Sequence, residues 1–492
     1  MALMLPSILA LVLTNQIITK YGSDVNGIFV TINQVVAFLV LLEGGFTLAT
    51  NVALFKPYKE KNYKFANSIL SATSKSFNII GVVFAIIAVL IAVFLPSVLK
   101  SNVSNIVITQ LMLLASLNTL YSFFFEYKYR VLFQTSQQEY LVLTINAVSS
   151  LIGYSLAIVA IQLGYSIVLV RIALLVPIII RFPTIYYLHH NRFPWVNFNE
   201  TPNFTAISGT LDVFVQKISD MLFFNTPVIV ISIMVGSVFA SVYAIYNSIF
   251  SLIRNVTYSF VMAPHNAFGQ ILAESGTKSI IRLFHLYQTI IMMIATILLT
   301  TTTIMILPFI NLFTQGVNDI NYIDANIAFL FLVAGLLEIT HISSRGILNI
   351  SGKFKYLKKI VAISSIINLV VSIILTNFIG IYGAIIGTIV GYLVLTPLTV
   401  IYTHKTYLNC GFDEFFKIVI PNIGLSFISV LISRNFEINL ENYFEFIILG
   451  FIIFSLISIA TILINLLFNR RLIIEAKEKI LKSKKLSDRR RK

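Results

Sequence analysis

FNIIGVVFAIIAVLIAVFLPSV, residues 77–98, is an apolar run without a single charged side chain. A hydrocarbon core about 30 Å thick needs about 20 helical residues, so this run is long enough to cross a bilayer as a helix. It is too uniformly apolar for a barrel strand, because barrel strands alternate between lipid-facing and lumen-facing residues. Similar runs occupy most of the chain. We predict an all-α polytopic membrane protein with fourteen transmembrane helices, at residues 2–19, 27–50, 77–98, 104–125, 141–161, 165–187, 213–234, 237–262, 286–310, 325–345, 359–377, 380–402, 417–433 and 444–468.

Basic residues fall almost entirely in every second gap between these runs. Of the 35 Lys and Arg residues, we assign 28 to one side of the membrane, 3 to the other side and 4 to membrane depth. The positive-inside rule places the richer side, with both termini, in the cytoplasm. The net charge of +15 therefore reflects membrane topology, and we expect no nucleic-acid partner.

The composition excludes a soluble protein, because 57% of the residues are hydrophobic, 11% are charged and the mean hydropathy is +0.89. The single cysteine, Cys410, falls in a predicted cytoplasmic loop, so it forms neither a disulfide nor a metal cluster. The sequence contains no Gly-rich phosphate loop, no metal-spaced His or Cys group and no nucleophile elbow. We therefore expect no enzyme activity, no catalytic residue, no metal and no cofactor.

An internal repeat divides the chain. Three pairs of segments recur at an offset of 214 or 215 residues: Gly22-Ser23 and Gly236-Ser237, residues 130–136 and 345–351, and Pro183 with His190 and Pro397 with His404. We infer one six-helix unit used twice in the same orientation, which is a parallel repeat of the kind found in transporters that alternate access. The predicted parts are a six-helix bundle at 1–190, a cytoplasmic linker at 191–211, a second six-helix bundle at 212–406, two further helices at 407–468 and a basic cytoplasmic tail at 469–492.

Ionisable residues at membrane depth are candidates for function, because an unpaired charge there is costly. Glu43 is a candidate coupling residue or a partner for an arginine, and the alternative is a structural carboxyl beside Gly44-Gly45, on one helix face with Thr47 and Thr50. We expect Arg171 to face a hydrated cavity. Arg181 lies closer to the cytoplasmic end, where a long side chain can reach the interface.

Three further helices carry candidate residues. Lys217 and Asp220, three residues apart, form either an internal ion pair that acts as a gate or brace or a substrate contact. Tyr243, Asn247 and Arg254 lie on one stripe of the helix predicted at 237–262, which suits an anionic, sugar-bearing substrate or, alternatively, helix packing. Glu338 and His341, with Arg345, form either a proton relay or a structural network. The aromatic run 121–125 is interpreted as lipid-facing or interfacial.

Several segments resemble the polysaccharide flippases of the multidrug/oligosaccharidyl-lipid/polysaccharide (MOP) exporter superfamily, particularly the Wzx-type repeat-unit flippases. These segments are residues 21–29 (YGSDVNGIF), 32–34 (INQ), 41–45 (LLEGG), 71–75 (SATSK) and 345–348 (RGIL). The resemblance implies a MATE-like fold and transport of an undecaprenyl-pyrophosphate-linked oligosaccharide to the outer leaflet of the bacterial plasma membrane for capsular or exopolysaccharide synthesis. Arg171 and Arg254 would then contact the pyrophosphate or acidic sugars, since guanidinium groups bind phosphate through forked donors.

The resemblance leaves alternative functions open. The first is a lipid II flippase for peptidoglycan, which shares the fourteen-helix plan. A cation-coupled multidrug antiporter of the same superfamily would usually have twelve helices and an acidic residue in its first helix, which this chain lacks. The third is a scaffold for a synthase complex. The expected partners are the lipid-linked substrate, membrane lipids, and a polymerase and glycosyltransferases of the same pathway.

Overall fold

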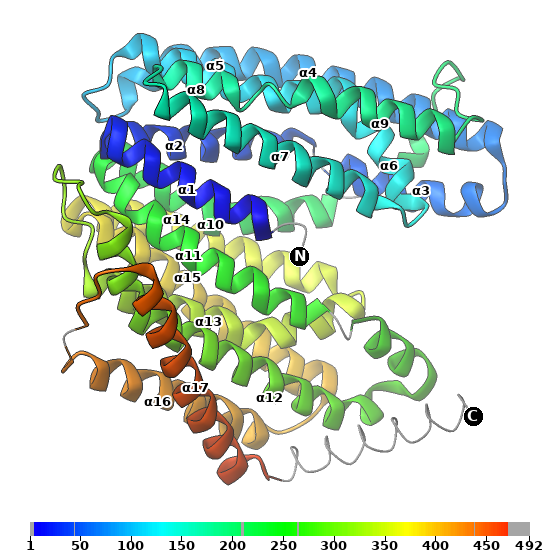
Figure 1. Cartoon of the computed structure of the whole chain (residues 1–492). Coiled ribbons are helices and arrows are strands. Elements are labelled where there is room, and N and C mark those ends of the chain that lie inside the picture. Colours follow the sequence, from blue (N-terminus) through cyan, green and yellow to red (C-terminus); the bar gives the residue numbers. More distant parts are fainter. Residues whose placement is uncertain (1–3, 44, 208–210, 263–264, 437, 471–492) are drawn as a thin grey trace, which may run out of the picture. The chain divides into compact units, whose positions relative to one another are not determined.

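The computed structural model describes residues 4–43, 45–207, 211–262, 265–436 and 438–470, and these residues form helices and connecting loops without a strand (Figure 1). The α-helices are α1 Met4–Tyr21, α2 Ser23–Val40, α3 Phe46–Lys59, α4 Tyr63–Val98, α5 Asn105–Tyr121, α6 Tyr127–Thr135, α7 Glu139–Gln162, α8 Ile167–Ala173, α9 Ile178–Arg192, α10 Leu211–Met234, α11 Ser237–Met262, α12 His265–Phe313, α13 Ala325–Ile350, α14 Phe354–Ile379, α15 Ile381–Ile401, α16 Asp413–Ser433 and α17 Tyr443–Phe468. Short 3-10 helices occur at Leu41–Glu43 and Thr205–Ile207, and π-helices at Ser122–Glu126 and Tyr402–Leu408.

The predicted all-helical membrane fold is confirmed. Where the structure describes them, all fourteen predicted stretches lie on helical segments, two of them with an interruption. Among the described residues, 11 helices are long and apolar enough to cross a membrane, so the number fourteen stays a prediction. Two helices are much longer than a bilayer requires: α4 has 36 residues and α12 has 49. At about 1.5 Å per residue, both extend well beyond the hydrocarbon core.

Two predicted helices are interrupted. The stretch 27–50 breaks beside Gly45, whose φ of 80° is a left-handed conformation that suits glycine. The stretch 165–187 breaks at 174–177, where a series of turns separates α8 from α9.

A third stretch, 104–125, continues instead of ending, because a π-helix at Ser122–Glu126 leads directly into α6. The predicted loop around Lys128 is therefore helical.

The chain divides into two compact units that differ from the predicted bundles. Unit 1 contains Met1–Val242 and Gly316–Ile320, and unit 2 contains Tyr243–Gln315 and Asn321–Lys492. Helix α10 belongs to unit 1 because it packs against α2. The domain boundaries taken from the repeat stay a prediction.

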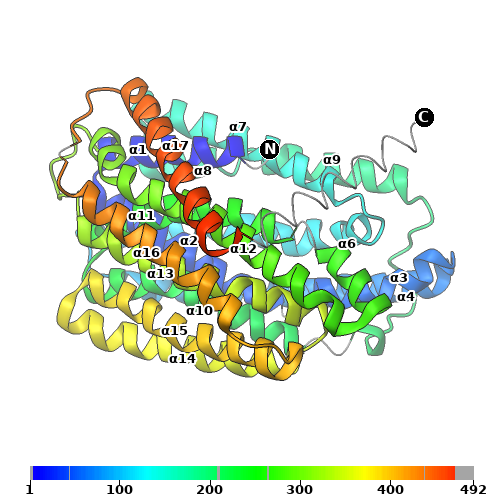
Figure 2. The same ribbon diagram turned by 90° about the horizontal axis from the view of Figure 1, so that it is seen from below.

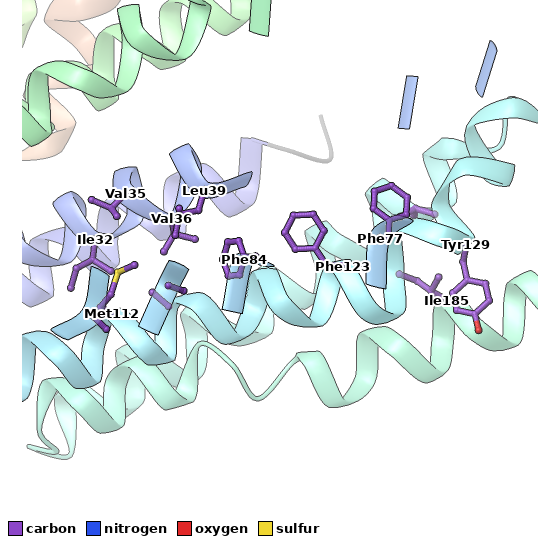
Figure 3. Close-up of a cluster of buried hydrophobic side chains, with 14 of the residues drawn as sticks. Ile32, Val35, Val36, Leu39, Phe77, Phe84, Met112, Phe123, Tyr129 and Ile185 are labelled. Atoms are coloured by element: carbon purple, nitrogen blue, oxygen red, sulfur yellow. The ribbon is translucent and has the colours of Figure 1, made fainter. Parts of the chain in front are cut away.

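Unit 1 is built around a continuous apolar core (Figure 3). Ile32 and Leu39 of α2, Phe84 of α4, Met112 of α5 and Phe123 of the π-helix are all at most 9% exposed. These side chains come from four helical segments, and Figure 3 shows them in one row along the interior. The core holds α2, α4 and α5 together, and some of the polar residues described below, such as Asn33 of α2 and Asn118 of α5, lie on the same helices.

Unit 2 relies on close backbone approach and on buried amides. Helices α14 and α15 lie side by side (Figure 2). A Cβ atom added to Gly387 would lie 2.1 Å from the Ser372 hydroxyl oxygen, so only glycine permits this packing. Helices α16 and α17 pack against α12 and against each other, where the Asn422 and Asn465 side chains exchange hydrogen bonds of 3.1 and 3.0 Å.

Candidate functional site: a cationic chamber in unit 1

A polar cavity of about 380 Å³ lies inside unit 1, and we call it the chamber. Side chains of α1, α2, α5, α7, α8 and α9 line it, together with the turn at 174–177. Its polar lining residues are Thr14, Asn26, Asn33, Asn118, Thr119, Ser149, Ser150, Tyr154, Arg171 and Arg181. Two arginines, Arg171 and Arg181, face the chamber, and a cation at membrane depth needs a partner or water.

The helix break at 174–177 lies between these two arginines. Arg171 is on α8 and Arg181 is on α9, while Leu174, Leu175 and Pro177 of the turn face the chamber. Hydrogen bonds between residues three apart replace the α-helical bonds between residues four apart here. For example, the Leu175 N–H donates to the Ile172 carbonyl at 2.8 Å. Non-helical backbone at membrane depth is tolerated where it lines a cavity, and interrupted helices often form transporter binding sites.

Arg171 is a buried cation without a carboxylate partner. Its side chain donates to the Asn33 Oδ1 atom at 2.8 Å, and the guanidinium carbon lies 4.5 Å from the centre of the Phe29 ring. Arg171 is only 9% exposed. In the part of the chain that the structure describes, no carboxylate oxygen lies within 4.0 Å of its nitrogens. The sequence-based prediction that Arg171 faces a cavity agrees with this position, while its role in binding stays untested.

Arg181 has a carboxylate partner that the sequence did not reveal. One of its terminal nitrogens lies 3.2 Å from Glu126 Oε2 and 3.1 Å from Asn118 Oδ1. Glu126 is 4% exposed and ends the π-helix. Tyr121 places its ring 5.3 Å from the Arg181 guanidinium carbon. Arg181, which was expected to be able to reach the interface, therefore pairs inside the protein. Of the run 121–125, interpreted as lipid-facing or interfacial, Tyr121 contacts Arg181 and Phe123 is buried, while Phe125 is exposed.

The remaining chamber residues carried no clear signal in the sequence. Asn33 and Asn118 are neutral amides within apolar runs, and Tyr154 resembles any other aromatic residue of a membrane helix. Polar amides in such runs often bond across helices, which is the one clue that sequence offers for Asn33 and Asn118. Glu126 falls just after the predicted stretch 104–125, so it was not among the ionisable residues considered at membrane depth.

Glu43 lies away from the chamber lining. It ends the 3-10 helix Leu41–Glu43, is partly exposed, and interacts electrostatically with Tyr127 of α6. The break at Gly45 puts Thr47 and Thr50 on a different helix, α3, so the predicted single face does not form. Lys217 and Asp220 belong to α10, but their side chains lie outside the described part of the chain.

The candidate residues of unit 2 form a separate network. Arg254 of α11 pairs with Glu338 of α13 at 3.6 Å. Tyr243 and Tyr392 interact electrostatically with Arg254, and Asn247 lies between Tyr243 and Arg254 on α11 with partial exposure. These residues, predicted separately for substrate contact and coupling, are therefore neighbours, and both roles stay predictions.

His341 lies one turn from Glu338 on α13 and makes its own contacts. Its Nδ1 atom lies 3.2 Å from the Thr396 hydroxyl and 3.3 Å from the Leu337 carbonyl, and the residue is 2% exposed. The predicted relay would need His341 to exchange protons with water. Its burial and its two local contacts favour the structural alternative.

A second polar cluster of unit 1, which we call the clasp, lies on the side opposite to the lysine-rich loops. The Asp24 carboxylate accepts hydrogen bonds from the Ser237 hydroxyl and, at 2.8 Å, from the Ser101 hydroxyl. The Asp319 carboxylate accepts 2.6 Å bonds from the backbone N–H and the hydroxyl of Ser23. Ser23 and Ser237 belong to the repeated Gly-Ser pairs, and each begins a helix after a glycine with positive φ.

Comparisons with known proteins identify the fold. No protein-family model and no curated protein matches the sequence. The structure of a protein described as "Lipid II flippase MurJ, inward closed conformation" matches with a TM-score of 0.68 and 16% identity, over 96% of this chain and 98% of that one. An inward-facing multidrug resistance MATE family transporter of the MOP superfamily matches with a TM-score of 0.63 and 12% identity, over 82% and 94%. The eukaryotic MATE transporter AtDTX14 matches with 0.55 and 14%, over 86% and 96%. The chain therefore has the fold of the MOP exporters.

Proposed function

We propose that this protein is a flippase that moves undecaprenyl-pyrophosphate-linked oligosaccharide repeat units from the inner to the outer leaflet of a bacterial plasma membrane, with both termini in the cytoplasm. The observation that carries the proposal is the chamber, which is lined by one buried arginine without a carboxylate partner, Arg171, and by a second arginine, Arg181. A lipid-linked pyrophosphate is an anion with an apolar tail and a polar head. Such a ligand needs an enclosed cationic site, while its tail can stay in the bilayer.

The lining of the chamber suits a sugar-bearing diphosphate. Guanidinium groups bind phosphate oxygens through two parallel donors, and each such charge-assisted bond is stronger than a neutral one. The amides and hydroxyls beside them, such as Asn118 and Ser149, can replace the water that sugar hydroxyls lose on leaving solution. With two arginines and one nearby carboxylate, Glu126, the chamber has an excess of positive charge.

A second candidate is a lipid II flippase, because the match to the MurJ structure covers nearly the whole of both chains. The chamber does not separate the two candidates, since both cargoes share the diphosphate and the polyprenyl tail and differ in the sugars. Multidrug antiport is less well supported. The MATE structures match a smaller share of this chain, and a cationic chamber repels the cationic drugs that such a transporter would have to bind.

The direct test is transport by the purified protein in liposomes. A fluorescent lipid-linked oligosaccharide is incorporated in both leaflets, and a membrane-impermeant quencher reports how fast the label reaches the outer leaflet. We expect wild-type protein to accelerate this exchange and Arg171→Gln to lower the rate by at least about tenfold, because one charge-assisted phosphate contact contributes on the order of 1.5–3 kcal/mol. Arg192→Gln is the matched control, since Arg192 at the end of α9 is exposed, lies outside the chamber lining and donates to the Gln138 amide oxygen. Equal rates for wild type and Arg171→Gln would refute the proposal.

The phenotype of cells depleted of the protein distinguishes the two candidate cargoes. If the cargo is a capsular or exopolysaccharide unit, depletion of the protein removes surface polysaccharide while the cells keep an intact wall. We would then look for the polymerase and glycosyltransferases of the pathway among the proteins that co-purify with it. Lysis with normal surface polysaccharide would instead favour the lipid II candidate.

A further inference from the structure

We infer that Glu126 is an internal counter-ion that a diphosphate ligand displaces from Arg181, so that Glu126 controls how strongly the chamber holds a diphosphate relative to a monophosphate. This inference rests on the proposed function, since it concerns the anion that enters the chamber. It assigns a specificity-determining role to a carboxylate that does not itself line the cavity.

The two arginines of the chamber differ in their partners. Arg171 bonds to a neutral amide oxygen of Asn33. Arg181 faces the chamber too, but its terminal nitrogen is shared between Glu126, Asn118 and the Ser122 hydroxyl, at 3.2, 3.1 and 3.4 Å. An anion with one phosphate can therefore bind Arg171 at full charge. A second phosphate meets an arginine whose charge is already compensated.

The Arg181–Glu126 contact is loose compared with another ion pair of unit 1. Its 3.2 Å separation exceeds the 2.7 Å between Arg130 and Glu139. Charge-assisted bonds between guanidinium and carboxylate groups usually measure about 2.7–2.9 Å. An anion that approaches the Arg181 guanidinium more closely can therefore compete with Glu126 for it.

One nitrogen of the Arg181 guanidinium is an unpaired donor. Its Nε atom is buried and has no hydrogen-bond partner among the described residues. A buried donor without a partner costs free energy, and it bonds readily to an acceptor that reaches it. A phosphate group that binds Arg181 through Nε and a terminal nitrogen would satisfy this donor with the forked geometry that guanidinium groups favour.

Glu126 keeps other partners when it loses Arg181. Its Oε1 atom accepts a 3.2 Å bond from the Asn146 amide, and Oε2 accepts a 3.3 Å bond from Ser122. The charged or titratable groups around it are Arg181 on α9, Tyr121 on α5 and Tyr127 on α6. The carboxylate is therefore not left bare, and it can return to Arg181 when the ligand leaves. A carrier needs such reversibility, because a ligand that is held too tightly is not released.

The test compares two short lipid phosphates as probes, farnesyl diphosphate and farnesyl monophosphate, by calorimetry with the full-length protein in detergent. Glu126→Gln should bind the diphosphate about tenfold more tightly, a change of about 1.4 kcal/mol, and the monophosphate with nearly unchanged affinity. Glu139→Gln is the matched control, because its partner Arg130 lies outside the chamber lining. Unchanged or weaker diphosphate binding by Glu126→Gln would overturn the inference, as would equal tightening for both probes.

A second variant covers the case in which Glu126→Gln does not fold. The double variant Glu126→Gln with Arg181→Gln removes both charges and leaves no buried charge unpaired. Its preference for diphosphate over monophosphate should be smaller than that of the wild type, because only Arg171 remains, and a preference equal to or larger than that of the wild type would contradict the inference.

Arg171→Gln separates this inference from the proposed function. If Arg171→Gln binds both probes as wild type does, the proposed function fails, whatever Glu126→Gln shows. If Arg171→Gln loses both probes while Glu126→Gln changes neither affinity, only the role of Glu126 fails.

Discussion

Gly27 of α2 lies against the backbone of Ser237, and this contact makes a sharp prediction about the clasp. A Cβ atom added at Gly27 would lie 1.7 Å from the Ser237 carbonyl oxygen and 2.4 Å from its carbonyl carbon. Real Cβ atoms essentially never approach closer than 3.0 Å. Backbone cannot move aside as a flexible side chain does, so Gly27→Ala must separate the start of α11 from α2 by more than about 1 Å.

The separation has an energetic consequence that can be worked out from the clasp. Three hydrogen bonds hold the start of α11. Two reach α2, from Asn26 to the Ser241 hydroxyl at 2.7 Å and from the Ser237 hydroxyl to Asp24, and the third runs from Ser237 N–H to the Lys100 carbonyl at 3.0 Å, in a loop that Asp24 holds against α2. A shift of more than about 1 Å takes such bonds past the limit of about 3.5 Å. At about 1 kcal/mol each, their loss disfavours the closed clasp by about 3 kcal/mol, on the order of a hundredfold in population.

Distances between spin labels measure this change. With Cys410→Ser as background, labels at Asn318, beside the Asp319 that binds Ser23 of α2, and at the exposed Phe239 of α11 report the separation of α2 from α11 by pulsed electron resonance. We expect a longer distance to dominate in Gly27→Ala and a short one in the parent. Gly424→Ala is the control, because nothing lies within 4 Å of a Cβ added at Gly424. Identical distance distributions in Gly27→Ala and its parent, with both proteins folded, would refute the reasoning.

Three other outcomes are expected. Gly387→Ala should lower the melting temperature of the purified protein, because its Cβ would lie 2.1 Å from the Ser372 hydroxyl and overpacking costs about 1–3 kcal/mol; an unchanged melting temperature would contradict this packing. Asn422→Ala and Asn465→Ala should each lower the free energy of unfolding by about 1 kcal/mol. The double variant should lose less than the sum of the two, since the second substitution breaks no further hydrogen bond between the pair; strictly additive losses in a double-mutant cycle would exclude the coupling. Burial raises the pKa of the Cys410 thiol, so less thiolate is present at neutral pH; a maleimide should label it slowly at pH 7, faster at pH 8.5, and only from the predicted cytoplasmic side. Rapid labelling of Cys410 in intact cells by an impermeant maleimide would show that the predicted orientation in the membrane is reversed.

The helices could be predicted because hydrophobic length alone determines them. Runs such as 77–98 and 444–468 contain too few polar groups to be anything but membrane helices, and both are helical in the structure. The helix interruptions could be predicted only in part. Gly44-Gly45 marked a weak point, whereas the break at 174–177 has no glycine and only Pro177 to indicate it.

The site was harder to predict, because it depends on how helices are rotated about their axes. The cation Arg171 could be selected by the cost of its burial, but its partner Asn33 lies 138 residues away on another helix. Glu126 escaped notice for a local reason. The π-helix carries the chain onward past Phe125, and no pattern in the sequence distinguishes a π-turn from the end of a membrane helix.

The turn at 174–177 has a consequence for how selectivity can change. In a continuous helix, the ten-residue interval between Arg171 and Arg181 would fix their axial spacing at about 15 Å. Here small torsional adjustments in Leu175 or Pro177 can alter that spacing while α8 and α9 stay intact. Substitutions of uncharged residues in this connection can therefore adapt the protein to larger or smaller head groups, so related proteins could diverge in cargo while keeping both cations.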